Sequence, residues 1–261
     1  MPQRETTIKK SDFVQSLEKG LRVISAFDNE NSEMTLTDVA KITNLTRANA
    51  RRILLTLEYL GYVHCEDGKL FSLSPRILSL GYSYLSSQSF QEIALPYMKE
   101  LTSQIEESCS MSVLDGNEIV YVARVQTKRI MTIALGVGTR LPVYATSMGR
   151  VLLAGMEAKE TENLLDKIEM KKFTQHTLTS KKTLLENVML AKDRGWAIAD
   201  EELEIGVRSI ACPIKNKDGK TVAALNVSCH ASRITRDDMT DKFLPELRKT
   251  ASIIENALHK L

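Results

Sequence analysis

Arginine and asparagine side chains gather near residue 50 in a pattern suited to contacts with nucleic acid. The cluster consists of Arg47, Asn49, Arg51 and Arg52. An Arg fork pairs with the guanine edge in the major groove, and an Asn amide pairs with adenine. Glu58 is the only acid in the helix predicted here, so the cluster favours a nucleic-acid contact over an ordinary solvated charged face.

A helix-turn-helix arrangement is predicted to position this cluster. A short helix that begins at Thr37, whose hydroxyl caps it, runs to Ile42, and Asn44 occupies the turn. Thr46 caps the next helix, which runs to about Leu60 and points the arginines outward from its first turns. An amphipathic helix over 16–29 precedes the pair.

A hairpin follows the second helix of the pair. Asp67-Gly68 is a strong two-residue turn signal between the apolar segments 62–66 and 69–73. A hairpin at this place is a wing, and Lys69 at its tip suits a phosphate contact. We therefore predict a winged helix-turn-helix domain over 11–74, with DNA contacts from Thr46, Arg47, Asn49, Arg51, Arg52 and Lys69.

An apolar helix is expected over 75–90, beginning at Pro75. Its apolar residues lie on more than one side, which favours packing against a second subunit. Two-fold symmetry also suits paired DNA half-sites, so we expect a homodimer or tetramer on a double-stranded operator.

The remaining chain, 91–261, alternates helices with antiparallel hairpins, which indicates an α+β sensor-like domain. Strands are expected at 110–114, 119–125, 130–135, 209–214 and 221–228, and helices at 95–107, from 147, near 160, at 184–194 and at 237–258. The segment Gly136-Val137-Gly138 lacks the third glycine and the helix of a dinucleotide fingerprint.

Composition excludes several other classes of protein. The 261 residues are 43% hydrophobic and 26% charged, which is typical of a globular protein rather than a disordered one. No apolar run approaches the about 20 residues of a membrane helix, and the charged first fifteen residues do not form a secretory signal. We expect a cytoplasmic protein without membrane contact. Its four cysteines are widely spaced, so neither a metal nor a cofactor is expected.

Taken together, these features resemble the IclR-type bacterial transcription regulators over 13–261. The matching segments are 16–21, 57–62, Gly195-Trp196 with Asp200-Glu201-Glu202, 206–211 and 232–235. Segments 49–57 and 144–154 look closest to the branch that controls protocatechuate and 4-hydroxybenzoate catabolism. The resemblance implies a winged helix-turn-helix, a dimerising linker helix and a GAF-like domain that binds a small organic acid.

The resemblance also implies a set of effector-binding positions. Carried over by matching motifs, they are Leu141, Ser147, Met148, Ala199, Val207, Ser209, Asn226 and Ser228. Ala199 falls where another family member carries an acid, so any polar contact from that position is lost in this chain.

The chemistry of these positions suits a hydroxylated acid. The segment 146–149 lies at a predicted helix N-terminus, where free N–H groups favour a carboxylate. Ser209, Asn226 and Ser228 suit a ring hydroxyl or the second carboxylate oxygen. Arg124 and Arg140 could pair with a second charge, but such arginines more often form surface or interface salt bridges, so they stay outside the expected site.

The sequence therefore predicts a DNA-binding regulator that senses a small aromatic carboxylic acid and controls aromatic catabolic genes, with activation as the expected sign. Three alternatives stay open: an IclR-type repressor that responds to a non-aromatic organic acid, a DNA-binding oligomer without a ligand, and a hydrolase with Ser147 as nucleophile. The hydrolase is disfavoured because no Gly-x-Ser-x-Gly motif surrounds Ser147 and no histidine is evidently paired with it.

Overall fold

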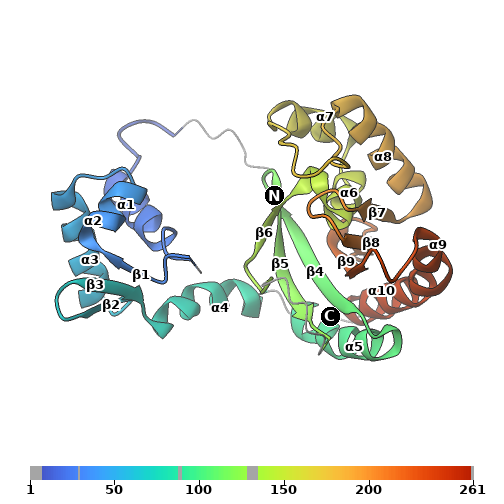
Figure 1. Cartoon of the computed structure of the whole chain (residues 1–261), viewed down its shortest axis with the longest axis horizontal. Helices are drawn as coiled ribbons and strands as arrows, with labels where there is room; N and C mark the ends of the chain where they lie inside the picture. Colours follow the sequence, from blue (N-terminus) through green and yellow to red (C-terminus); the bar gives the residue numbers. More distant parts are fainter. Residues whose placement is uncertain (1–7, 29, 88–89, 128–134, 260–261) are drawn as a thin grey trace. The chain divides into compact units, whose positions relative to one another are not determined.

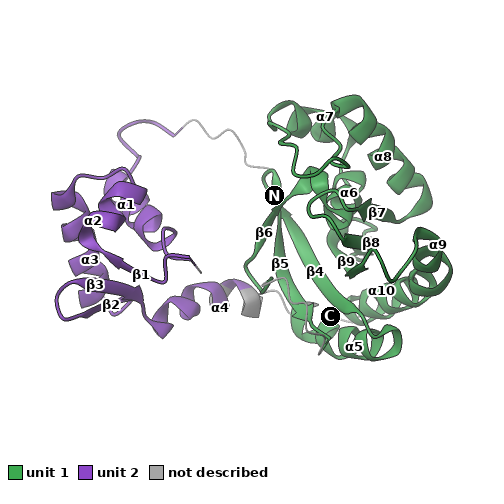
Figure 2. Ribbon diagram, in the orientation of Figure 1, with its two compact units in different colours: residues 1–3, 89–261 green, residues 4–88 purple. Residues whose placement is uncertain are grey.

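The computed structural model describes residues 8–28, 30–87, 90–127 and 135–259. The chain divides into two compact units, whose described residues fall within Arg4–Gln88 and Ser89–Leu261 (Figures 1 and 2). Each unit has its own hydrophobic core.

The N-terminal unit packs three helices against a small antiparallel sheet of order β1-β3-β2 (Figure 1). Its elements are α1 (Gln15–Ile24), β1 (Glu33–Thr35), α2 (Leu36–Ile42), α3 (Arg47–Tyr59), β2 (Val63–Glu66) and β3 (Leu70–Leu73). Ala50, Leu54 and Leu57 turn one side of α3 into the core, where they meet Val39 and Phe71. This is the winged helix-turn-helix that the sequence predicts.

Two helix ends differ from the expectation. The cap of α2 is Thr35, which exchanges hydrogen bonds with Asp38 in a capping box, so the helix begins at Leu36 and not at Thr37. Helix α1 ends at Ile24, before the predicted 28–29. The carboxylate of Asp28 instead accepts backbone N–H bonds from Glu30 and Asn31, which holds a turn at this point.

The turns of this unit follow the sequence signals. Asn44 adopts a φ of 52° between α2 and α3, and Asp67 and Gly68 adopt φ values of 50° and 67° at the tip of the wing. A short 3₁₀ helix, η1 (Pro75–Ile77), then leads into α4 (Leu78–Ser87).

The C-terminal unit is built on a six-stranded antiparallel sheet of order β6-β5-β4-β9-β8-β7. Its strands are β4 (Ser108–Asp115), β5 (Glu118–Val125), β6 (Arg140–Pro142), β7 (Ala197–Asp200), β8 (Val207–Lys215) and β9 (Thr221–His230). The fold is α+β, as predicted. The strand expected at 130–135 lies almost entirely outside the described residues.

Helices cover both faces of this sheet (Figure 1). One face packs against α5 (Phe90–Ile105) and α10 (Leu244–Leu258), and the other against α6 (Ser147–Ala154) and α8 (Lys181–Arg194), with α7 (Ala158–Asp166) beside them. The shorter elements are η2 (Val143–Ala145), α9 (Arg236–Asp238) and the π-helical η3 (Met239–Phe243). The helix expected from 237 is thus the succession α9, η3 and α10.

Helix α6 is the buried element around which the site is arranged. The Thr146 side chain caps it by accepting the Gly149 N–H at 3.0 Å, and every residue from Ser147 to Ala154 is buried. A Cβ on Gly149 would lie 1.9 Å from the carbonyl oxygen of Val143. Only glycine therefore allows α6 to approach the preceding 3₁₀ turn this closely.

Candidate functional site

The N-terminal unit presents the expected DNA contacts on the first turns of α3. Arg47, Arg51 and Arg52 are exposed, and Asn49 is half-buried. The exposed Thr46 accepts the Asn49 N–H at 3.3 Å, so its hydroxyl also serves as the helix cap. Lys69 is exposed beside the tip of the wing. The exposed guanidinium groups are free to approach phosphates or base edges.

The C-terminal unit contains a cavity of about 270 Å³ between the sheet and the N-terminal end of α6. This volume is near the lower limit of ~300–1,000 Å³ for small-molecule sites, so it suits a compact ligand. All the expected effector positions except Ser147 line it: Leu141, Met148, Ala199, Val207, Ser209, Asn226 and Ser228. The lining also includes side chains that the sequence reasoning left out, namely Tyr121, Arg124, Leu135, Ala145, Thr146, Glu202, Leu203 and Glu204.

Ser147 lies behind the cavity wall. Its hydroxyl shares a 2.8 Å hydrogen bond with the hydroxyl of Ser209, which does line the cavity. Ser147 itself is fully buried. It therefore ties α6 to β8, and it can act on a ligand only through Ser209.

A row of polar side chains crosses the central strands of the sheet on the face that carries α6. Ser110 of β4 pairs in register with Arg124 of β5 on one side and with Asn226 of β9 on the other. Directly paired residues of neighbouring strands share a face, so all three side chains point the same way. Arg124 Nη1 donates to Ser110 Oγ at 3.1 Å.

Two atoms of this row are buried and have no hydrogen-bond partner among the described residues: Arg124 Nε and Asn226 Oδ1. Burial lowers the pKa of the Arg124 guanidinium from its usual value. Burial also raises the pKa of Tyr121 to about 12, although the charge of Arg124 opposes this shift. The wall thus contains a partly desolvated cation beside a buried amide oxygen that has no partner.

The two arginines left outside the predicted site have different surroundings. Arg140 forms ion pairs with Glu118 at 2.7 Å and with Asp115 at 2.8 Å near the edge of the sheet. Arg124 lines the cavity, and no carboxylate of the described residues forms an ion pair with it.

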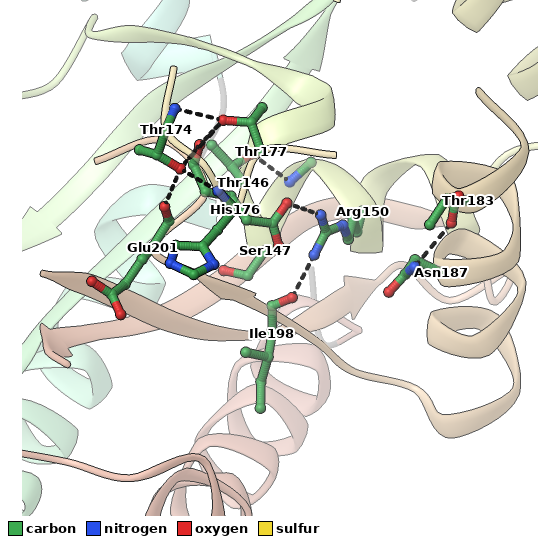
Figure 3. A network of polar contacts seen from close by, with 12 residues as sticks. Thr146, Ser147, Arg150, Thr174, His176, Thr177, Thr183, Asn187, Ile198 and Glu201 are labelled. Carbon is green, nitrogen blue, oxygen red and sulfur yellow. Dashed lines mark hydrogen bonds and ion pairs between the residues drawn. The ribbon is translucent and has the colours of Figure 1, made fainter. Parts of the chain in front are cut away.

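A network of polar contacts joins α6 and the segment 174–177 to the segment that follows β7 (Figure 3). Glu202, Leu203 and Glu204 of that segment line the cavity. Arg150 of α6 forms an ion pair with Glu202 and donates to the carbonyl of Ile198 at 2.6 Å. The hydroxyls of Thr174 and Thr177 donate, each at 2.6 Å, to the carbonyls of Glu201 and Glu202. The sequence analysis did not predict this network, although Asp200-Glu201-Glu202 is part of a segment that resembles the IclR-type regulators.

The described part of the chain gives no indication of a metal centre or a membrane span. Its His, Cys, Asp and Glu side chains form no group of three that could hold a metal ion. All four cysteines are free thiols. None of the helices in the described ranges is long and apolar enough to cross a bilayer.

Two family models match the chain. The model "Bacterial transcriptional regulator IclR C-terminal" matches residues 82–256, and the model "IclR helix-turn-helix domain" matches residues 16–66. The first covers more than half of the chain, and together they span both compact units.

Curated relatives and a solved structure match as well. The Pca regulon regulatory protein of Pseudomonas putida is 41% identical over 90% of this chain and 81% of its own length. The p-hydroxybenzoate hydroxylase transcriptional activator of Acinetobacter baylyi is 34% identical over 98% of this chain and 96% of its own. The inducer-binding domain of PobR from Acinetobacter, a double mutant in complex with 3-hydroxybenzoic acid, is 33% identical with a TM-score of 0.61, and the match covers 64% of this chain and 98% of that domain.

Proposed function

The chain belongs to the IclR family of bacterial transcriptional regulators, and from this premise we propose that it is an activator of aromatic catabolic genes whose effector is a hydroxylated aromatic acid. The helix-turn-helix binds DNA, and the effector enters the cavity beneath α6. Family membership places the chain among regulators, so the reading of Ser147 as a hydrolytic nucleophile is set aside.

The cavity wall is the observation that carries this proposal. It combines an apolar portion, which includes Leu141, Met148 and Val207, with the polar row of Arg124 and Asn226. An aromatic ring fits the apolar portion, and a carboxylate or hydroxyl fits the polar row. The names of the relatives support the proposal, since one is a Pca regulon regulatory protein, one is a p-hydroxybenzoate hydroxylase transcriptional activator, and one is solved with 3-hydroxybenzoic acid.

Isothermal titration of the full-length protein tests the effector. The panel is 4-hydroxybenzoate, protocatechuate, 3-hydroxybenzoate and pyruvate. Saturable heat with an aromatic acid and none with pyruvate is expected. Binding of pyruvate alone would favour the alternative, a sensor for a non-aromatic acid. Absence of binding by all four compounds would refute the proposed effector.

The DNA contacts of α3 and the wing are part of the same proposal. Arg51→Ala or Arg52→Ala should cost about 1–3 kcal/mol of operator binding and relax discrimination at one base position. Lys69→Ala should reduce the salt slope by about 1 without changing base preference, as expected of a phosphate contact. Lys19→Ala on α1 is the control, because this lysine lies outside α3 and forms no ion pair with a described residue. Equal losses for all of these variants would refute the assignment.

We also propose that the regulator works in the cytoplasm as a homodimer or tetramer on a two-fold operator. Apolar side chains of α4 support this, since Leu78 and Tyr82 are 71% and 64% exposed. Exposed apolar surface of this kind is typical of subunit contacts. Sedimentation velocity with and without operator DNA measures the assembly, and a monomer bound to a single half-site would contradict it.

A further inference from the structure

One cation in the effector cavity, Arg124, forms no ion pair with any described residue, although Glu202 and Glu204 also line the cavity. Arg124 reaches the cavity from the central part of the sheet, its Nε is buried, and no described residue accepts a hydrogen bond from that atom. Arg150, which is fully buried, has its charge balanced by Glu202. Arg124 is half-buried, and a partly desolvated guanidinium without an ion pair is costly, so an anion that enters the cavity relieves this cost.

The N-terminal end of α6, the other expected place for an anion, has its polar side chains already engaged. Thr146 Oγ1 accepts the Gly149 N–H at 3.0 Å, and Ser147 Oγ is bonded to Ser209 Oγ at 2.8 Å. A carboxylate placed there would have backbone N–H groups to bind but no formal positive charge. At Arg124 it would instead complete a hydrogen-bonding set that is unfinished.

We propose that the guanidinium of Arg124 binds the carboxylate of the effector and makes the site select acids over their neutral analogues. The inference rests on the proposed function and deepens it. Nη1 stays on Ser110 Oγ, 3.1 Å away, and this bond fixes the plane of the fork. Nη2, from which no described residue accepts a hydrogen bond, then donates to the carboxylate, and the rest of the ring system extends along the apolar wall toward Leu141 and Met148.

Position in the sheet makes Arg124 a suitable anchor. Ser110 separates it from Asn226 in one row, so the cation and the unpartnered amide oxygen face the same space from strands two apart. Tyr121 also lines the cavity from the same strand. A hydrogen bond from a desolvated cation to an anion is worth more than one at the surface, so this single contact can dominate selectivity.

The test pairs a charged ligand with a neutral one of the same shape. Isothermal titration measures 4-hydroxybenzoate and 4-hydroxybenzamide with the wild-type chain, Arg124→Gln, and the control Arg140→Gln, whose arginine pairs with Glu118 and Asp115. The wild type should prefer the acid by at least 10-fold. Arg124→Gln should weaken acid binding by about 10–100-fold and change amide binding by less than about 3-fold. Arg140→Gln should leave both affinities unchanged.

Other outcomes would refute either the role of Arg124 or the proposed function. Equal weakening of acid and amide by Arg124→Gln would make Arg124 a structural residue and end the inference, while the proposed function would stand. If the wild-type protein binds the amide as tightly as the acid, the inference is wrong. This comparison does not depend on whether the variant folds. Absence of binding by the wild type to every aromatic acid would overturn the proposed function and this inference together.

Discussion

Replacing Glu202 with Gln should leave the guanidinium of Arg150 buried without a counter-charge. The two side chains are only 9% and 2% exposed. Removing one partner of such a pair costs about 3–5 kcal/mol, and the glutamine oxygen still accepts a hydrogen bond, so about 3 kcal/mol is expected. For a unit of this size that corresponds to a fall in Tm of about 6–12 °C.

The assay is urea unfolding followed by tryptophan fluorescence. Trp196 is the only tryptophan of the chain and lies next to β7, so its signal reports on the C-terminal unit alone. Glu118→Gln is the matched control, because its ion pair with Arg140 is exposed and should contribute no more than about 1 kcal/mol.

A double-mutant cycle provides the refutation. Arg150→Met combined with Glu202→Gln should lose less stability than the sum of the two single variants, since the second change removes the orphaned charge. Additive losses, or a loss below about 1 kcal/mol for Glu202→Gln, would show that the ion pair does not hold the segment 201–206 in place.

Two further predictions concern packing and thiol chemistry. Gly149→Ala should cost about 3 kcal/mol or more in the same unfolding assay, because the new methyl would lie 1.9 Å from the Val143 oxygen; a near-neutral variant would contradict the close approach of α6. Burial raises the pKa of both Cys212 and Cys229 to about 12, so at pH 8 their thiolate populations are minute. At that pH, a disulfide reagent should rapidly modify only the half-buried Cys65 in the folded protein, and all four thiols after denaturation. The reactivity of the folded protein should rise as the pH is raised. Rapid modification of two or more thiols in the folded protein would refute this prediction.

The parts of the fold that could be predicted depend on residues close together in the sequence. Asp67-Gly68 allows the positive φ values of the wing turn, and Thr46 offers a hydroxyl one residue before α3. The cap of α2 was assigned to the wrong threonine because Thr35 and Thr37 both precede the apolar run. Only the reciprocal bond with Asp38 distinguishes them.

Elements stabilised by distant partners could not be predicted in this way. Strands β1, β6 and β7 are only three, three and four residues long, and each exists because a longer strand lies beside it. The Arg150–Glu202 ion pair could not be predicted either, because its members are 52 positions apart in the sequence. Sequence alone does not distinguish Arg124 from Arg140. The pairing of β5 with β4 places Arg124 beside the cavity, and the pairing of β6 with β5 places Arg140 near two carboxylates.

The sheet order has a consequence for protein synthesis. Strand β9 is the last of the strands to be translated, yet it lies between β4 and β8 and joins the two halves of the six-stranded sheet. A nascent chain therefore completes its helix-turn-helix long before it has a sensor. At ~5–20 residues added per second, the interval from Gln88 to His230 is roughly 7–28 s. A product that stops before Thr221 retains the sequence of the DNA-binding unit and lacks Asn226, so it carries the recognition helix without the means to respond to an effector.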